Sequence, residues 1–403
     1  MQRRDLLGFL AAAPLAGAAG RLMAAPAAGG AKLLVVFLRG AYDCASLLVP
    51  VASDFYYASR PNIAIARPGS PDGALPLDSD WGLHPALAQS VMPLWRQKQA
   101  AFVAFAGTDD LTRSHFETQD SIELGQALDR RRDYRSGFLN RLAGVLGAGP
   151  VADVSPIAFT DQLPISLRGD AKAVNMALAG NARSGIGARQ SQVIAAMYRN
   201  TSLAQPVAEG FQVRDEVMRA VKAEMDAASR NAMTAKGFER VARRMALLMS
   251  ERFDIGFVDV GGWDTHVGQG AATGYLALRL EELGRGLAGF AQEMSEDAWR
   301  QTVVVVISEF GRTFRENGNR GTDHGHGTVY WVLGGGLSAQ AGGRVVGEQQ
   351  ALTQATLFQN RDHPVLNEYR AVLGGLFQRM YGLSPAQLAK VFDGVAPKDL
   401  GLV

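Results

Sequence analysis

Four stretches of the chain are apolar at nearly every position, without the alternation that marks a half-exposed strand. They read KLLVVFL from residue 32, AAFVAFAG from residue 100, FDIGFVDVGG from residue 253 and TVVVVIS from residue 302. A continuous apolar run that ends at glycine or polar residues is typical of a strand buried on both faces of a sheet. We therefore predict four buried strands.

Apolar residues recur at helical spacing between and after these strands. Ser114 has the residue type of an N-cap, and Phe116, Ile122 and Leu128 fall on one face of the helix predicted to follow it. Residues 193–249, 274–294 and 366–382 also have helical patterns. Strands that alternate with helices predict an α/β fold, here a three-layer α/β/α sandwich around a mostly parallel sheet.

No linker divides the chain, so we predict a single domain over residues 28–403. Residues 151–178 look like a small β excursion, and we expect them to form a small α+β cap insertion with the helices that follow, at about 151–250.

Residues 1–27 have the features of an export signal. Arg3 and Arg4 precede an alanine-rich run, and residues 25–27 offer a small-x-small cleavage site. The paired arginines indicate a twin-arginine signal, so we expect the twin-arginine export machinery as a partner and the periplasm or the medium as destination. The run is shorter than the ~20 residues that span a bilayer, so no stable transmembrane anchor is expected; an uncleaved anchor is the alternative.

Composition narrows the remaining function classes. The 403 residues are 47% hydrophobic and 20% charged, which is an ordinary globular balance, and the net charge of +2 supplies no basic stripe for nucleic acid. The single cysteine, Cys44, excludes an internal disulfide.

Polar side chains that can do chemistry follow each predicted strand. In a parallel sheet the carboxyl ends of the strands meet at one edge, where ligands bind. The residues are Asp43; Thr112, Arg113, Ser114 and His115; Asp264 and His266; Glu309 and Arg312; and Asp323, His324 and His326.

Histidine and carboxylate together suit zinc, manganese or a similar divalent ion. Two separate groups, WDTH at 263–266 and TDHGH at 322–326, lead us to expect two ions. The expected ligands are Asp43, Asp264, His266, Glu309, Asp323, His324 and His326. Structural alternatives stay open, since Asp43 can cap a turn and His115 can be an ordinary first-turn residue.

Six motifs lie in order along nearly the whole chain: RRDLL, FLRGAYD, TRSHFETQD, GGWDTH, SEFGRT and GTDHGHG. Together they resemble the DUF1501 family of exported bacterial proteins, related to the alkaline phosphatase and sulfatase superfamily. The resemblance implies an α/β/α sandwich that holds two divalent ions and a nucleophile for phosphate or sulfate esters. It places metal ligands at Asp43, Asp264, His266, Asp323 and His324.

The sequence departs from the superfamily pattern at three places. Asp264 and His266 are one residue apart instead of three. Residues 308–311, SEFG, stand where an Asp-His-Gly motif is expected, so either Glu309 is a ligand or residues 322–327 have moved into a loop. The sulfatase signature is absent around Cys44, so a formylglycine is not expected there.

The nucleophile is open between Ser114 and Thr112, at a helix start that favours an anionic group. Cys44 is a rival if it is a thiolate and is otherwise a buried apolar residue. His115 is a further catalytic candidate, while Arg113 and Arg312 can grip an anion or form structural ion pairs.

Three functions remain. The first is an exported metal-dependent hydrolase of small-molecule or glycan phosphate or sulfate esters. The second is a catalytically inactive relative that binds a metal or an envelope ligand. The third is a transferase of phospho-groups in the cell envelope.

Overall fold

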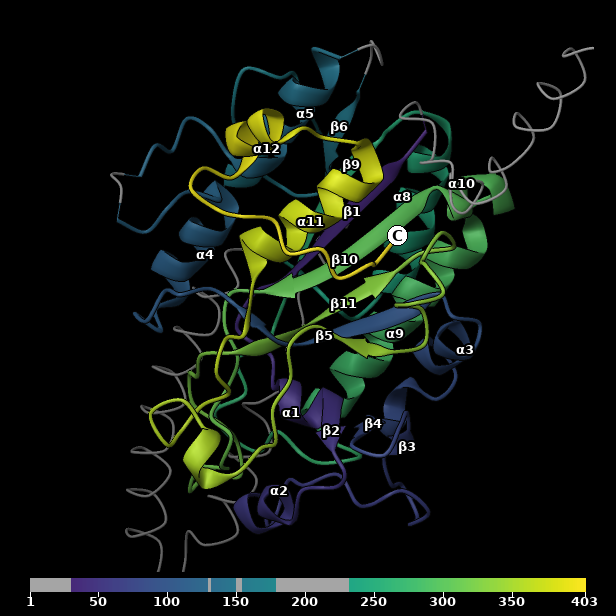
Figure 1. The fold of residues 1–403 in the computed structure, drawn as a ribbon. Helices are drawn as coiled ribbons and strands as arrows, with labels where there is room; N and C mark the ends of the chain where they lie inside the picture. The colour runs from purple at the N-terminus through teal and green to yellow at the C-terminus, as the bar shows by residue number, and fades with distance from the viewer. Residues whose placement is uncertain (1–29, 130–131, 150–153, 179–231) are drawn as a thin grey trace, which may run out of the picture.

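The computed structural model describes residues 30–129, 132–149, 154–178 and 232–403; the expected export signal lies outside them. A large central sheet runs through the molecule (Figure 1). Its neighbouring strands, in spatial order, are β12 (Val345–Val346), β5 (Ala100–Gly107), β11 (Thr328–Leu333), β10 (Thr302–Ser308), β1 (Lys32–Leu38), β9 (Ile255–Gly261), β6 (Pro156–Ala158) and β7 (Val174–Asn175). Two short strands pair off this path, β13 (Asn367–Glu368) with β5 and β8 (Met233–Thr234) with β9. The four predicted buried strands are therefore confirmed as β1, β5, β9 and β10.

Helices cover both faces of this sheet, as the three-layer prediction requires. In β1, alternate residues face opposite layers: Leu34 and Val36 pack in one apolar core, while Leu33 and Val35 pack in the other. The first core includes α3 (Val91–Arg96), α8 (Phe238–Glu251), α9 (Tyr275–Glu293) and α10 (Glu296–Arg300). The second includes α4 (His115–Leu124), α5 (Phe138–Gly147), α11 (Tyr369–Tyr381) and α12 (Pro385–Val391).

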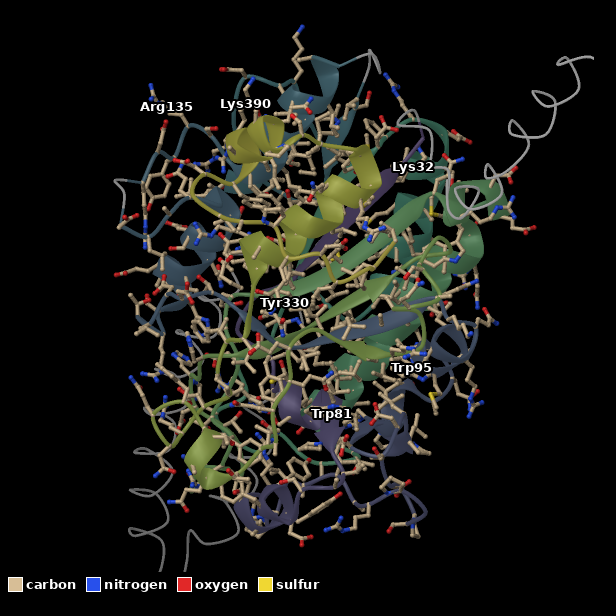
Figure 2. The ribbon with its side chains drawn as sticks, in the orientation of Figure 1. Lys32, Trp81, Trp95, Arg135, Tyr330 and Lys390 are labelled. Carbon is tan, nitrogen blue, oxygen red and sulfur yellow. The ribbon has the colours of Figure 1, made fainter. Side chains whose placement is uncertain are left out.

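Side chains follow this layering. Tyr330 of β11 and Trp95 of α3 are buried within the molecule, whereas Arg135 and Lys390 lie on its outside (Figure 2).

The connections between the layers carry the remaining short elements. These are α1 (Cys44–Leu47), α2 (Asp54–Ser59), the 3-10 turns Pro85–Leu87, Ile165–Leu167 and Gln354–Thr356, and an antiparallel sheet of β2 (Leu48–Pro50), β4 (Trp81–Leu83) and β3 (Leu75–Pro76).

The direction of β11 decides where the glycine-rich stretch lies. β1 is parallel to β9 and β10, but β11 is antiparallel to both β10 and β5. β5 therefore runs with β1, and its carboxyl end lies at the same edge as those of β9 and β10. Because β11 is reversed, the loop that precedes it, residues 322–327, also reaches that edge.

The structure describes the range of the expected cap, about 151–250, only in part. β6 and β7 extend the main sheet beside β9, and α8 packs against α9 in a covering layer. Residues 179–231, which hold most of the expected helices of this range, lie outside the described residues. Within the described ranges, no helix is both long enough and apolar enough to cross a membrane.

The expected apolar face of α4 is wrong in two of its three residues. Ser114 caps the helix by accepting a hydrogen bond from the backbone N–H of Glu117 at 3.4 Å, but the helix ends at Leu124. Phe116 and Leu128 are exposed, and Ile122 alone is buried. Apart from Leu124, the other inward positions are polar. Residues 115, 119 and 123 among them contact charged groups at the edge of the sheet.

Candidate metal centre

Histidines from distant parts of the chain meet around one carboxylate at the carboxyl edge of the sheet. His115 begins α4, Asp264 and His266 follow β9, and His324 lies in the loop before β11. One ligand atom from each of His115, Asp264 and His324 lies within 4.8 Å of the other two. Among the described residues, this group can hold a metal ion.

The Nε2 atom of His324 faces the Nε2 atoms of the other two imidazoles. Nε2 of His324 lies 2.9 Å from Nε2 of His115 and 3.1 Å from Nε2 of His266. Nε2 of His266 is also 2.9 Å from Oδ1 of Asp264, while Nε2 of His115 is 3.5 Å from Oδ2. Nitrogen ligands that surround a tetrahedral zinc ion at about 2.0–2.1 Å are about 3.3 Å apart. The contacts of His324 therefore have nearly the spacing of ligands to one ion.

The other nitrogen of each ring, Nδ1, faces an oxygen that cannot donate a hydrogen. For His115, His266 and His324 in turn, these acceptors are Oε1 of Glu309 at 2.8 Å, Oδ1 of Asp323 at 3.1 Å and the carbonyl oxygen of Arg113 at 3.0 Å. The neutral rings of His115 and His324 therefore carry their hydrogen on Nδ1 and direct the lone pair of Nε2 into the cluster, whereas both nitrogens of His266 face a carboxylate oxygen. Facing lone pairs repel unless a cation lies between them, and metal-binding histidines usually have such an outer acceptor.

Asp264 has a free ligand atom. It is almost completely buried, and its Oδ1 accepts a hydrogen bond from Arg312. Its Oδ2 is buried without a hydrogen-bond partner among the described residues. Burial alone would raise the pKa of Asp264, but its contacts with the three histidines and the charge of Arg312 hold that pKa far below its usual range. The carboxylate is thus ionised, and the unpartnered oxygen fits a metal ion.

His115 gains a proton easily when no ion is bound. Burial alone would lower its pKa, but contacts with the carboxylates of Asp264 and Glu309 outweigh burial and raise that pKa to about 9. A proton and a metal ion therefore compete for the same place between the rings.

A buried network supports His115 from behind. Oε1 of Glu309 also accepts hydrogen bonds from the backbone N–H of Gly40 at 2.8 Å and from Gln119 at 2.9 Å. Gln119 in turn accepts one from Arg39 at 2.9 Å, and Arg39 forms ion pairs with Asp259 and Glu123. Burial opposes ionisation of Glu309, but its bonds to His115 and Gln119 outweigh it and lower its pKa. Glu309 is therefore an outer partner of His115.

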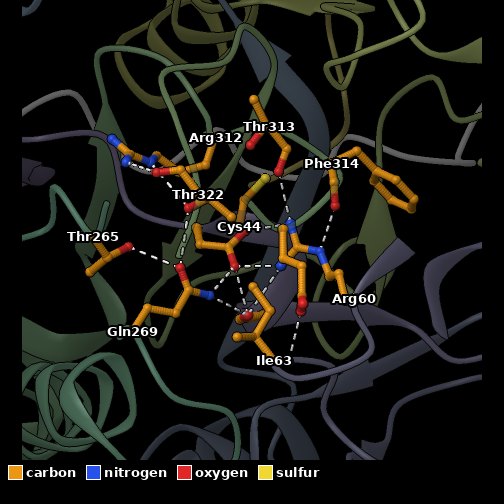
Figure 3. A network of polar contacts seen from close by, with 12 residues as sticks. Cys44, Arg60, Ile63, Thr265, Gln269, Arg312, Thr313, Phe314 and Thr322 are labelled. Carbon is orange, nitrogen blue, oxygen red and sulfur yellow. Dashed lines mark hydrogen bonds and ion pairs between the residues drawn. The ribbon is translucent and has the colours of Figure 1, made fainter. Parts of the chain in front are cut away.

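A second network supports Asp264, and Figure 3 shows its members Arg312, Thr322 and Gln269. Arg312 is buried and donates to Asp264 and to Thr322. The hydroxyl of Thr322 donates to Gln269 at 3.1 Å, and Gln269 donates to Oδ2 of Asp43 at 2.6 Å. Arg312 therefore positions a ligand and has no free face for a substrate anion.

The structure places Asp43 outside the cluster. Its two oxygens accept hydrogen bonds from Arg60 at 2.5 and 3.0 Å, and Ser46 donates to it at 2.7 Å. Burial alone would raise the pKa of Asp43, but the charge of Arg60 outweighs burial and lowers that pKa to about 2. Asp43 forms a buried structural ion pair.

Four further candidates lie beside the cluster, and among the described residues only Arg113 bonds to it, through its backbone carbonyl and His324. The ring of His326 packs on Phe358, with centroids 4.6 Å apart, and burial lowers the pKa of this histidine to about 4. The guanidinium of Arg113 binds Asp362, and the hydroxyl of Thr112 contacts that of Thr118 at 3.3 Å. No hydrogen bond within the described residues joins Thr112 or Ser114 to the cluster.

Cys44 and His363, neighbours in the core, also stay outside the cluster. The thiol of Cys44 lies 3.9 Å from Nδ1 of His363. Burial raises the pKa of Cys44 to about 12, so this residue is a buried thiol and not a thiolate.

One side of the cluster opens to solvent. The side chains of His266 and His324 are 19% and 18% exposed, and that of Asp323 is 49% exposed, whereas His115 and Asp264 are buried. Burial opposes ionisation of Asp323, but hydrogen bonds from Asn317 and His266 outweigh it and lower its pKa. The cluster is therefore partly accessible to solvent beside an ionised carboxylate.

The glycines of residues 321–327 allow two chain segments to pack closely. A Cβ atom added at Gly325 would lie 2.5 Å from the backbone carbon and oxygen of Arg312. The hydrogen bond from Gly325 N–H to the carbonyl of Gly311, at 2.8 Å, holds the same two segments together. The glycines therefore fold the backbone around another backbone segment, which in turn places His324.

We expect Gly325→Ala to lower the free energy of unfolding by about 1–3 kcal/mol, because overpacking displaces backbone that cannot yield. Metal affinity should fall with it, since His324 is the adjacent residue. Denaturant unfolding and metal titration measure the two effects. The control is Gly318→Ala, where a Cβ meets nothing within 4 Å. Equal behaviour of the two variants would contradict this account.

The sequence predictions omit several residues that organise the site. Gln119 and Glu123 repeat at four-residue intervals after His115, which places all three on one face of α4. That spacing could have identified Gln119 and Glu123 as neighbours of His115. Arg60 and Gln269 come from loops far from their partners along the chain, and nothing in the sequence pattern marks them.

A comparison with known families agrees with the motifs. A family model described as "Protein of unknown function (DUF1501)" matches residues 31–392. No curated protein matches the chain. The match covers most of the chain, including every residue of the cluster. The chain belongs to the DUF1501 family.

Proposed function

We propose that the protein binds one divalent metal ion and uses it to hydrolyse phosphate or sulfate esters. The ligands would be Nε2 of His115, His266 and His324 and the carboxylate of Asp264. One observation carries the proposal: three imidazoles with occupied Nδ1 atoms face a carboxylate that has a buried, unpartnered oxygen. Three nitrogens and one oxygen suit zinc, manganese or iron.

A single ion fits the described residues better than the expected pair. Asp43 is bound by Arg60, and Glu309 accepts bonds from His115, Gln119 and Gly40. His326 packs on Phe358, away from the cluster. All three residues were expected as metal ligands, and each has another partner.

The bound ion would act as a Lewis acid that polarises the ester and lowers the pKa of a water molecule. The half-exposed carboxylate of Asp323 lies on the open side and can accept a proton from the attacking water. The water oxygen forms the new bond to phosphorus or sulfur, and the ester oxygen leaves with a proton as the alcohol. Water attacks directly in this proposal, because Ser114 and Thr112 make no bond to the cluster.

The ester class and the location extend the proposal beyond the geometry. The resemblance to the alkaline phosphatase and sulfatase superfamily supports phosphate and sulfate esters. Export through the twin-arginine pathway to the periplasm or the medium rests on residues 1–27. A folded, metal-loaded protein suits that pathway.

The test compares metal-free protein with protein reconstituted with zinc or manganese, using p-nitrophenyl phosphate and p-nitrophenyl sulfate. We expect turnover in the reconstituted protein alone. Asp323→Asn keeps an acceptor for His266, so it should retain metal while kcat falls by about 10²–10⁴-fold. Ser114→Ala should keep the wild-type kcat.

Three outcomes would change the proposal. Equal turnover by His324→Ala would show a contaminating activity. Loss of turnover in metal-loaded Ser114→Ala would restore a covalent nucleophile. A loaded protein that cleaves neither ester class would favour the metal-binding or transferase alternative.

A further inference from the structure

The tight turn at residues 357–362 carries a buried carboxylate that the proposed reaction does not use. Asp362 is fully buried, and its Oδ1 has no hydrogen-bond partner among the described residues. Burial raises the pKa of this group above its usual value despite the nearby arginines. A buried oxygen without a partner costs stability, so Asp362 is poorly explained as a device for folding alone.

The other oxygen of Asp362 holds Arg113 in place. Oδ2 accepts hydrogen bonds from Nε of Arg113 at 3.1 Å and from Nη2 at 2.7 Å, and Gln359 accepts another from Nη2 at 2.6 Å. Arg113 has a φ of +53°, in the left-handed region that L-residues other than glycine seldom adopt. In this conformation its carbonyl oxygen accepts the hydrogen bond from Nδ1 of His324 at 3.0 Å.

The same turn also supports the partner of His266. Asp362 pairs with Thr313 in an isolated bridge. The backbone N–H of Thr313 donates to the carbonyl of Asp323 at 2.9 Å, and that of Asp323 donates to the hydroxyl of Thr313 at 3.1 Å. Asp323 in turn accepts the hydrogen bond from Nδ1 of His266. One turn therefore lies behind the outer partners of two of the three histidines.

We propose that Asp362 and Arg113 are positioning residues for the metal centre. Their ion pair holds the Arg113 carbonyl where it selects the Nδ1–H form of His324 and directs Nε2 into the cluster. This inference rests on the metal site of the proposed function, but the state of His324 can be measured without any metal.

The chain offers a matched control on the same carboxylate. Arg361 donates to Oδ2 of Asp362 at 3.1 Å, as Arg113 does, but it makes no bond to His324. Arg113→Gly removes the side-chain anchor, keeps the carbonyl and suits a positive φ. Arg361→Ala removes the same charge from the same oxygen. A difference between the two variants therefore reports the link to His324.

The experiment uses wild type, Arg113→Gly, Asp362→Asn and Arg361→Ala. In the metal-free proteins, ¹⁵N-histidine NMR reports which ring nitrogen of His324 carries hydrogen. We expect Nδ1–H in wild type and Arg361→Ala, and a mixture of both forms in the other two variants. Competition with a chromophoric chelator gives the zinc Kd. It should rise by about 10–100-fold in Arg113→Gly and Asp362→Asn and by less than about twofold in Arg361→Ala.

Denaturant unfolding shows whether each variant is folded. An unchanged His324 form and an unchanged Kd in folded Arg113→Gly would overturn the inference. So would an equal loss of affinity in Arg361→Ala, because charge alone would then explain the effect. If wild type binds no zinc, the proposed function fails, while the NMR comparison still decides the role of Arg113.

Discussion

Protein purified without chelators will carry close to one divalent ion per chain, and His324→Ala will carry almost none. His324 lies between His115 and His266, so its loss removes the nitrogen that contacts both neighbours. Outer partners of metal ligands typically change affinity by about 10–100-fold, and loss of a direct ligand should exceed that range. Mass spectrometry of dissolved metals gives the stoichiometry, and chelator competition gives the Kd.

His326→Ala is the matched control for this measurement. It removes an imidazole two residues away in the same glycine-rich stretch, but from a ring that packs on Phe358. We expect it to retain its ion. A stoichiometry near two would restore the original expectation of a paired site. No ion after reconstitution, or equal loss in His326→Ala and His324→Ala, would contradict the proposed centre.

Arg60→Met will lower the free energy of unfolding by about 3–5 kcal/mol, because it leaves the charge of Asp43 buried without its partner. Both side chains are fully buried, and both oxygens of Asp43 accept bonds from Arg60. Replacing Asp43 by Asn in the Arg60→Met background should recover part of that loss. Denaturant unfolding of the metal-free proteins measures each value.

The same pair predicts how stability depends on pH. The pKa of Asp43 is about 2 in the folded protein, against about 3.9 for an unfolded aspartate. The folded pKa is the lower one, so the stabilisation is complete above about pH 4 and is lost as pH falls toward 2. Its size is on the order of 2–3 kcal/mol. Wild type should lose this increment on acidification, and the double variant should not.

An exposed pair supplies the control. Arg300 forms ion pairs with Glu296 and Asp297 on the surface of α10. Exposed pairs contribute about 0–1 kcal/mol, so Arg300→Met should change stability little. A similar loss in Arg300→Met and Arg60→Met would mean that burial is not the cause.

The correct and incorrect sequence predictions have different physical origins. The four strands were predictable because a strand buried on both faces must be apolar at nearly every position. Which aspartate lies in the cluster was harder to predict, since Asp43 and Asp264 have the same residue type and both follow strands. Arg60 binds both oxygens of Asp43, whereas Oδ2 of Asp264 has no hydrogen-bond partner among the described residues. No local pattern distinguishes an aspartate that pairs with a distant arginine from one that faces three imidazoles.

The sequence by itself determined the buried strands, the layered architecture and the set of polar residues that gather at one edge of the sheet. Only the tertiary structure decided which of those residues share a centre. His115, Asp264 and His324 are far apart along the chain, and their distances depend on strand order and on the reversal of β11. The local pattern of apolar residues predicts which positions are buried. Which side chains meet depends on contacts between distant segments, and the local sequence does not encode these contacts.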